Sequence, residues 1–438
     1  CSEIYKKEQQ NSHHRLKRAL KEKNTNISKL IIDRVGDIEI SDEDGLNPLH
    51  RAVDEGMLDV VDYLIKKGVN IQSKTKNGNT PLHIAAMDGH TEIAELLVEN
   101  GADIHARSEN YHNCTPLQDA VLCSKLEVAK FLISKGATLN NARGGTPLYW
   151  AMREDYCGYD PKAADFLIEM GTDVNSCIDY REWDQMRTAL HLARHLSTVN
   201  LLIDKGANVN AMDKSLNTPL HSAWTPSIAK CLIQHGAEVN ASNKLGDTPL
   251  HFVRNFHVAK VLIEKGGNVN ASNNEGYTPL HTARNTVIAK LLLENGAELK
   301  KVTKDGKTVV HTSAEADVFS HSQYKDVPEV VEFFLQKACK KKNGIANAVD
   351  SNGCSPLYFA VSNGFKDITS LLLENGANVA QVTNSGSTLL HLAAAKGDAE
   401  LTATIFKHAK KNGSSNVLSM LREKMEPQLS ILLLRMDL

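Results

Sequence analysis

Histidine is the residue type whose number and spacing could most readily do chemistry in this sequence. The chain has 18 histidines in 438 residues, and eight of them end a recurring four-residue segment, at His50, His83, His191, His221, His251, His281, His311 and His391. Imidazole titrates near neutral pH and is a common metal ligand, so a regular series could form a metal site or a proton relay. Metal ligands must converge on one point, however, whereas rings one repeat apart diverge along the chain. We therefore predict a structural role, with no metal and no cofactor.

The cysteines form no pattern typical of a zinc cluster or a disulfide framework. They are scattered without a Cys-x-x-Cys pair, at Cys1, Cys114, Cys123, Cys157, Cys177, Cys231, Cys339 and Cys354, so we expect reduced thiols. The sequence has no His-Glu-x-x-His segment, phosphate-binding loop or Gly-x-Ser-x-Gly segment. Nothing in it brings Cys123 and His112 together as a catalytic pair. We predict that this chain is not an enzyme.

The composition indicates a folded, nearly neutral protein. Its 50 lysines and arginines balance 52 aspartates and glutamates, which gives a net charge of -2 and no field that would favour nucleic acid. Apolar residues make up 42% and aromatic residues only 5%, which fits helices packed through small side chains. No apolar run approaches the ~18 residues that a membrane helix needs. We predict a cytoplasmic protein with no nucleic-acid partner and no membrane span in this segment, which begins with Cys1 and is interpreted as part of a longer chain.

The histidines belong to an anchor of the type Thr-Pro-Leu-His that recurs eleven times. Its last residues are His50, His83, Gln118, Tyr149, His191, His221, His251, His281, His311, Tyr358 and His391. Most spacings lie between 30 and 35 residues. Thr before Pro predicts a helix start, because the hydroxyl caps a backbone N–H and Pro occupies the first helical position. Glycines after the leucine-rich stretches predict left-handed helix ends, at Gly101, Gly136, Gly206, Gly236 and Gly296.

This anchor and period resemble the ankyrin repeat family, whose repeat has about 33 residues. The resemblance covers roughly residues 41–413 and implies an all-α repeat solenoid of helix pairs with β-turn fingers, stacked around a continuous core. It also implies that the anchor histidine bonds to the neighbouring Thr and to the finger backbone, joining one repeat to the next. Residues 1–40 are interpreted as a degenerate N-terminal helical cap or eroded repeat, and residues 414–438 as a C-terminal helical cap or truncated repeat.

The first departure from the repeat is the 42-residue spacing that begins at Tyr149. Insertions near residues 153–187 account for it, and residues 149–183 hold six of the 13 tyrosines and tryptophans. Tyr, Trp and Arg dominate many binding hot spots. We predict partner contacts by Trp150, Arg153, Tyr156, Tyr159, Tyr180 and Trp183. The alternative is that these rings only plug the insertion against its neighbours.

The second departure is a run of four 30-residue units, which lack about three residues near the turn between their helices, where full repeats carry a pair such as Gly89-His90. Three residues after each anchor stand Arg194, Trp224, Arg254 and Arg284. We expect them on the end of the first helix, which in ankyrin folds lines the concave face, as a groove for an acidic or aromatic-bearing segment. The alternative is a solvated face of long side chains, neutralised by Asp213, Asp247 and Glu275.

The third departure is the 47-residue spacing from His311 to Tyr358, with insertions near residues 314–354. The C-terminal segment ends in an apolar run, residues 431–434. Such a run would be exposed unless it is packed or continued, so self-association through the C-terminus is an expectation.

The resemblance implies a protein-binding scaffold as the main function, and we expect it to bind a target protein through its concave face, its fingers and the aromatic-rich insertion. The short units also look similar to ankyrin proteins of intracellular bacteria, which act as effectors on host proteins, and this would place the chain in the host cytoplasm. One alternative is the substrate-recruiting arm of a larger enzyme, for example a ubiquitin-pathway factor, with its catalytic domain outside this sequence. Another is the cytosolic domain of a membrane protein.

Overall fold

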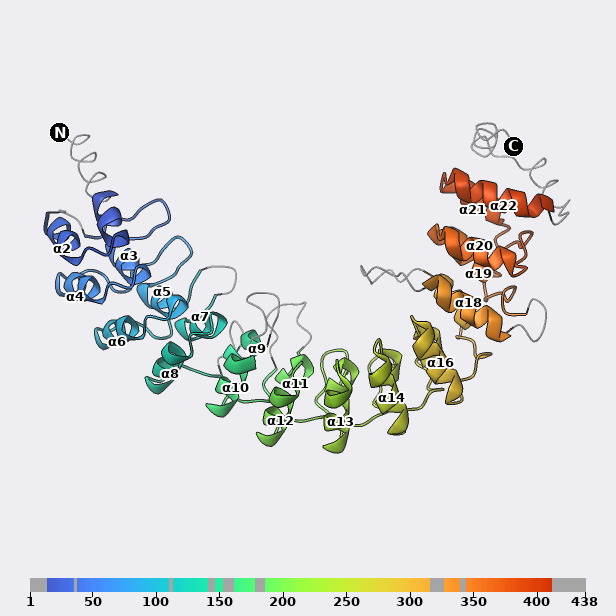
Figure 1. The fold of residues 1–438 in the computed structure, drawn as a ribbon, viewed down its shortest axis with the longest axis horizontal. Coiled ribbons are helices and arrows are strands. Elements are labelled where there is room, and N and C mark those ends of the chain that lie inside the picture. Colours follow the sequence, from blue (N-terminus) through green and yellow to red (C-terminus); the bar gives the residue numbers. More distant parts are fainter. Residues whose placement is uncertain are drawn as a thin grey trace. The chain divides into compact units, whose positions relative to one another are not determined.

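The computed structural model describes residues 14–34, 38–109, 113–140, 146–152, 161–177, 186–315, 327–338 and 344–411. The chain divides into two compact units, residues 1–214 and residues 215–438. In each unit, Figure 1 shows one helix pair following another along the chain. The predicted C-terminal cap, residues 414–438, and its apolar run lie outside the described residues.

The first unit begins with a helical stretch over residues 14–21 and α2 (Thr25–Arg34). Five helix pairs follow it: α3 (Pro48–Asp54) with α4 (Leu58–Lys66), α5 (Pro81–Asp88) with α6 (Thr91–Glu99), α7 (Pro116–Leu122) with α8 (Leu126–Ser134), α9 (Pro147–Ala151) with α10 (Pro161–Glu169), and α11 (Ala189–Leu192) with α12 (Leu196–Asp204).

The described residues of the second unit form six pairs, in which η1 and η2 are single 3-10 turns. They are η1 (Pro219–Ser222) with α13 (Pro226–Gln234), η2 (Pro249–His251) with α14 (Phe256–Glu264), α15 (Pro279–Thr282) with α16 (Thr286–Glu294), α17 (Val309–Ala314) with α18 (Val327–Ala338), α19 (Pro356–Asn363) with α20 (Lys366–Glu374), and α21 (Leu389–Ala395) with α22 (Ala399–Lys411). The described residues contain no strand beyond an isolated bridge between Val382 and Thr388. The all-α prediction is confirmed.

The predicted helix starts and ends are confirmed. Thr115 precedes Pro116 in extended conformation, and its hydroxyl accepts the backbone N–H of Gln118 over 3.4 Å. The Thr side chain therefore replaces a hydrogen-bond partner that the first turn of α7 lacks. At the other end, Gly101 has φ +92°, a left-handed conformation in which a side chain would be strained.

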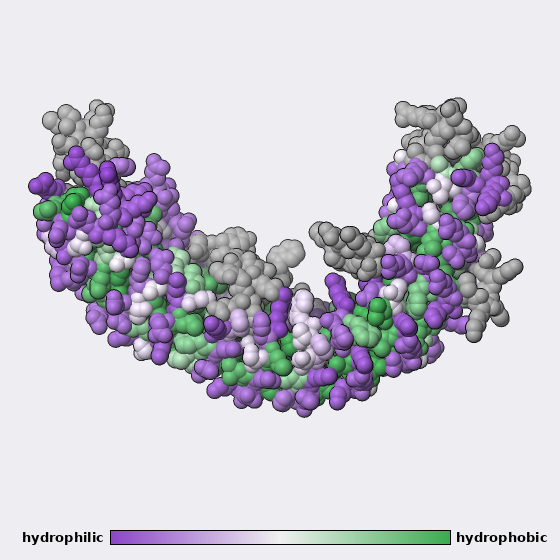
Figure 2. Space-filling model, viewed as in Figure 1, coloured by the Kyte–Doolittle hydropathy of each residue, from purple (hydrophilic) through white to green (hydrophobic). Residues whose placement is uncertain are grey.

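Leucine and alanine side chains build the core of each unit. The helix α5 packs against α3 on one side and α7 on the other, while α6 packs between α4 and α8. The buried residues of α5 and α6 include Leu82, Ala85, Ile93 and Leu97. Hydrophilic side chains cover much of the face drawn in Figure 2, with hydrophobic ones between them. None of the helices that the structure describes is both long enough and apolar enough to span a bilayer.

Candidate functional site

The anchor histidine of a full repeat, His83, is hydrogen-bonded through both ring nitrogens. The backbone N–H of Thr80 donates to Nδ1 of His83 over 3.1 Å, and Nε2 of His83 lies 3.1 Å from the carbonyl oxygen of Cys114. A donor at Nδ1 requires a lone pair there, so the proton lies on Nε2 and is donated to Cys114. His83 is therefore a neutral ring that joins its own helix start to the following repeat.

The same link recurs in the second unit. His221, His251 and His311 each place Nε2 3.1 Å from a carbonyl oxygen, of Asp247, Tyr277 and Cys354 respectively. Each acceptor directly precedes the N-cap residue of the next first helix. These bonds confirm the structural role predicted for the anchor histidines. Among the residues that the structure describes, no group of three or more His, Cys, Asp and Glu side chains could hold a metal ion.

Burial keeps these rings uncharged. Loss of solvent lowers the pKa of His83 and of His281 to about 4. The same cause lowers the pKa of His50, His251 and His311. A buried imidazole that is neutral at pH 7 offers no positive charge to a partner, so a charged binding surface must come from the residues around the anchors.

The missing three residues of the short units come from the first helix. In full repeats α5 has 8 residues and α7 has 7, whereas α11, η1 and α15 have 4 and η2 has 3. After this single turn the backbone is extended, with φ −65° and ψ 113° at Ala223. The expected position of Arg194, Trp224, Arg254 and Arg284 on the end of the first helix is therefore wrong. They lie in the linker, each directly before the N-cap residue of the second helix.

This change exposes a position that is otherwise in the core. Three residues after the anchor, Ala86 of α5 is 0% exposed and Val121 of α7 is 2% exposed. In the second unit the residue at this position is Trp224, which is 54% exposed, then Arg254, which is also exposed, and then Arg284, which is half-buried. We call these three residues the short-repeat row. Arg194 occupies the same position in the first unit and is half-buried.

Sequence reasoning missed one further aromatic residue beside the row. Phe252 follows the anchor His251 directly and is 45% exposed, whereas Ile84 at the same position of a full repeat is buried. The ring of Phe252 lies edge-on to that of His221, with 5.8 Å between the centroids. A large aromatic residue directly after an anchor in a short unit was the available signal.

Side-chain caps replace the lost helical turn. The Oδ1 atom of Asn285 accepts the backbone N–H of Ile288 over 2.8 Å, and the hydroxyl of Thr225 accepts that of Ile228 over 3.2 Å. Asn255 caps α14 in the same way. The second helices of full repeats, such as α6 and α8, begin without a side-chain cap. The caps fix the backbone next to the short-repeat row.

Two of the acidic residues expected to neutralise the row are engaged on the fingers. Asp213 lies 3.7 Å from Nε of Arg187, and its side chain is 1% exposed. Asp247 is buried and accepts a hydrogen bond from Nδ2 of Asn273 over 2.7 Å. Within the described residues, Arg254 makes no hydrogen bond or ion pair with an acidic side chain. The positive charge of Arg254 is therefore not paired with an acidic side chain of the described residues.

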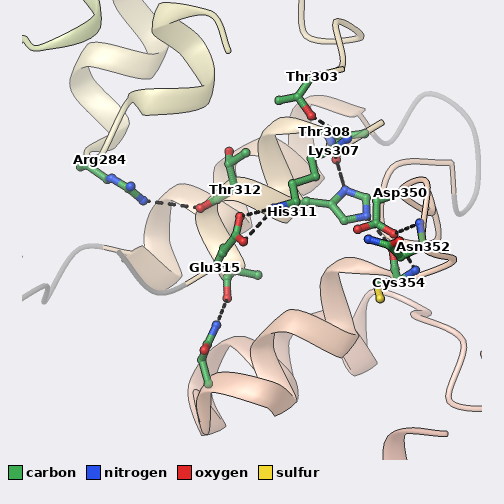
Figure 3. Close-up of polar contacts among 12 residues, drawn as sticks. Arg284, Thr303, Lys307, Thr308, His311, Thr312, Glu315, Asp350, Asn352 and Cys354 are labelled. Carbon is green, nitrogen blue, oxygen red and sulfur yellow. Dashed lines mark hydrogen bonds and ion pairs between the residues drawn. The ribbon is translucent and has the colours of Figure 1, made fainter. Parts of the chain in front are cut away.

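The row ends at a polar cluster around α17, drawn in Figure 3. Nη1 of Arg284 points to the carbonyl oxygen of Thr312, 3.5 Å away. Nearby, Nζ of Lys307 bonds both carboxylate oxygens of Glu315, over 2.7 and 2.9 Å. Burial alone lowers the pKa of Lys307, but the bond and charge of Glu315 outweigh it, so the pKa is raised. This pair joins the residue before the N-cap of α17 to its C-cap residue, Glu315.

One of the aromatic residues predicted to contact a partner is buried in the structure. Trp150 is 3% exposed and packs edge-on against Tyr149, with Leu122 and Leu192 beside the pair. It fills the core of the first unit, so the prediction that Trp150 contacts a partner is wrong. The other residues predicted there lie outside the described residues, at Arg153, Tyr156, Tyr159, Tyr180 and Trp183.

Stacked helix pairs joined by anchor histidines define a helical repeat solenoid. The family model for ankyrin repeats in three copies matches residues 16–108, 158–243, 224–303, 282–383 and 319–416, and that for a single ankyrin repeat matches residues 112–145. The chain belongs to the ankyrin repeat family. Ankyrin repeats imply a protein–protein interaction scaffold and are in general non-catalytic.

A viral protein shares part of this sequence. The ankyrin repeat domain-containing protein OPG015 of Monkeypox virus is 40% identical over 72 residues, which are 16% of this chain and 16% of the viral protein. The match therefore spans about a sixth of the relative's length. It adds a second line of similarity to ankyrin repeat proteins.

Proposed function

We propose that this chain binds a target protein through the short-repeat row of its second unit, together with Phe252. The observation that carries the proposal is that one repeat position changes from core to surface at Trp224 and Arg254 and becomes half-buried at Arg284. Trp224 is 54% exposed where Ala86 of a full repeat is 0% exposed. Large aromatic and guanidinium groups are the side chains that most often anchor a protein interface.

The arrangement of the row favours binding of a partner over stability of the folded chain. An exposed indole surface in water costs free energy that a partner recovers by covering it. The caps Thr225, Asn255 and Asn285 hold the adjacent backbone, so little ordering entropy is lost when a partner binds. Arg194 in the first unit, and Arg153, Tyr156, Tyr159, Tyr180 and Trp183 in the insertion, remain proposed contacts of the same kind.

The finer part of the proposal is that the target is a protein of a eukaryotic host and that binding takes place in the host cytoplasm. Its support is the similarity of the short units to ankyrin proteins of intracellular bacteria. Self-association through the C-terminal segment is a separate proposal, which sedimentation of the full chain would test.

Affinity capture from eukaryotic cytosol tests the proposal. The bait is the full chain, compared with a double variant, Trp224→Ser with Arg254→Glu. Its matched control is Lys230→Glu with Lys260→Glu, which changes charge on the exposed faces of α13 and α14. Circular dichroism first establishes that each bait is folded. We expect the double variant to lose a partner that the control retains; identical capture by all three baits would remove the row from the proposed function.

A further inference from the structure

The repeats that carry the short-repeat row follow one another with the same spacing in space. His221 and His251 bond to carbonyls 26 residues further on, each over 3.1 Å. On the fingers, Nδ2 of Asn240 donates to the carbonyl of Gly266 over 3.0 Å, and Nδ2 of Asn270 to that of Gly296 over 2.8 Å. The same bonds at the same offset mean that equivalent atoms in these repeats are one repeat pitch apart.

The pitch follows from helix packing. Neighbouring helices pack with axes about 8–10 Å apart, and α14 packs against both α13 and α16. Residues at the same position of consecutive repeats are therefore separated by roughly 9–10 Å along the row. The sequence of side chains along it is an indole at Trp224, a guanidinium at Arg254 and a guanidinium at Arg284.

Few backbone conformations of a bound segment match this pitch. A polyproline II segment has three residues per turn and rises about 3.1 Å per residue, so residues i and i+3 share a face about 9 Å apart. In a β-strand, residues i and i+3 point to opposite faces, and i+2 and i+4 fall at about 7 and 13 Å. An α-helix matches only with residues seven apart, at about 10.5 Å.

The chemistry of the row favours the polyproline II segment over the helix. Such segments dock on exposed aromatic side chains, and Trp224 and Phe252 provide two of them. The backbone carbonyls of a polyproline II segment are not used internally, so they can accept hydrogen bonds from the guanidinium groups, whereas those of a helix are already bonded.

We propose that the row takes an extended, acidic segment of a partner protein in polyproline II conformation. An apolar or proline side chain of the segment covers Trp224. A carboxylate three residues before or after it, depending on the direction of the segment, pairs with Arg254. A second carboxylate, three residues further in the same direction, extends toward Arg284. This proposal rests on the proposed function and names the class of segment that the row recognises. The bond from Arg284 to Thr312 makes Arg254 the main charge contact.

Fluorescence anisotropy with labelled synthetic peptides tests the proposal on the full chain. The first peptide is a proline-rich host with leucine at i and glutamate at i+3 and i+6, and a second carries the reversed order. A third has the same composition with glutamates at i+2 and i+4. A fourth is a helical peptide with glutamates seven residues apart. We expect the better of the first two peptides to bind at least about tenfold more tightly than the third and the fourth, with affinity falling as salt rises.

An exchange of charge between Arg254 and the peptide gives the most direct test. Arg254→Glu should weaken the best proline-rich peptide about tenfold, and replacing its glutamates with lysines should restore binding to this variant. Lys230→Glu, with the same change of charge on α13, should leave affinity within about twofold. If all peptides bind the wild-type chain equally or not at all, or the helical peptide binds best, the polyproline II proposal is overturned.

The two proposals fail differently. If the double variant loses its captured protein but spacing has no effect on peptide affinity, the proposed function stands and only the inferred segment is wrong. If capture is unchanged by the double variant, the row is not the binding surface, whatever the peptides show.

Discussion

Full repeats of the first unit and short repeats of the second connect their first helix to their second helix in different ways. In α5 the first helix runs through Asp88 and ends at Gly89 with φ +85°, which turns the chain toward α6. In the second unit the helix before α13 ends after one turn, at Ser222, and an extended linker leads to the next helix. The difference shows how a small deletion changes which residues meet solvent while the repeat register stays intact.

The anchor tolerates this change because its contacts lie at the helix start. His83 and His251 bond the same two groups, the backbone N–H of their N-cap residue and a carbonyl of the next repeat. The lost residues follow the anchor, where Ala86 is buried in full repeats. The histidine-to-carbonyl bond is thus separate from the position three residues after the anchor, where the burial of the side chain changes.

The largest effect is expected from placing a short-repeat residue in a full repeat. Ala86→Arg puts an unpaired charge at a fully buried position, so the free energy of unfolding should fall by at least about 3 kcal/mol. Arg254→Ala, at the exposed equivalent, should change it by less than about 0.5 kcal/mol. Urea denaturation followed by circular dichroism measures both. Equal effects would mean that the two positions are not different in burial.

Acid should destabilise both kinds of repeat through their anchors. The pKa of His83 and of His281 is lowered from 6.5 to about 4, so the unfolded chain binds protons that the folded chain does not. The associated stability is complete above pH 6.5 and is lost as pH falls from 6.5 toward 4, on the order of 3 kcal/mol per ring.

The chain provides its own control for this pH dependence. Gln118 occupies an anchor position, and its Oε1 accepts the N–H of Thr115 over 2.8 Å without a titrating group. His83→Gln should therefore reduce the loss of stability between pH 6.5 and 4, measured by urea denaturation at several pH values. An unchanged pH profile would show that His83 does not contribute to it.

A smaller effect should separate the two ways of starting the second helix. Asn285→Ala removes the bond to the N–H of Ile288 and should cost about 1 kcal/mol of unfolding free energy. Lys125→Ala at the start of α8, which has no side-chain cap, should cost less than about 0.5 kcal/mol. Thermal denaturation of the two variants compares them; a larger loss for the lysine variant would contradict the assigned role of the caps.

The smallest effect concerns one finger of the second unit. Leu216 has φ +61° at the place where the next finger has Gly246, with φ +79°. Left-handed backbone strains a leucine, so Leu216→Gly should raise the free energy of unfolding by about 0.5–1 kcal/mol. Gly246→Ala should lower it, because a Cβ there would lie 2.8 Å from the backbone nitrogen of Asn274. A destabilised Leu216→Gly would show that the leucine side chain stabilises this finger.

The repeat architecture and the helix starts were predictable because their signals are local. Thr and Pro at fixed spacing specify a cap and a first helical residue, whereas the bond of the anchor ring to the next repeat was expected from the resemblance to the ankyrin repeat. The position of Trp224 and its equivalents was not predictable in the same way. Removal of three residues can shorten either a helix or a turn, and propensity does not decide between them when packing holds both helices.

The error at Trp150 has a different cause. Enrichment in aromatic residues indicates an unusual segment but not whether its rings are buried, and all five residues of α9 are buried. The ring pair of Trp150 with Tyr149 arises from packing with Leu122 and Leu192, which are distant in sequence. Phe252 was missed because the equivalent residue of a full repeat, Ile84, is buried.

The histidine-to-carbonyl bond gives the array a polarity. In the bonds made by four anchor rings the proton donor belongs to the earlier repeat and the acceptor to the later one, at His83, His221, His251 and His311. A version shortened from the C-terminal side would therefore leave its last anchor ring open to water, and the pKa of that ring should return toward 6.5. A version shortened from the N-terminal side would leave only a carbonyl, which water can solvate without any change of charge. The stability of the two shortened versions would therefore depend on pH in different ways.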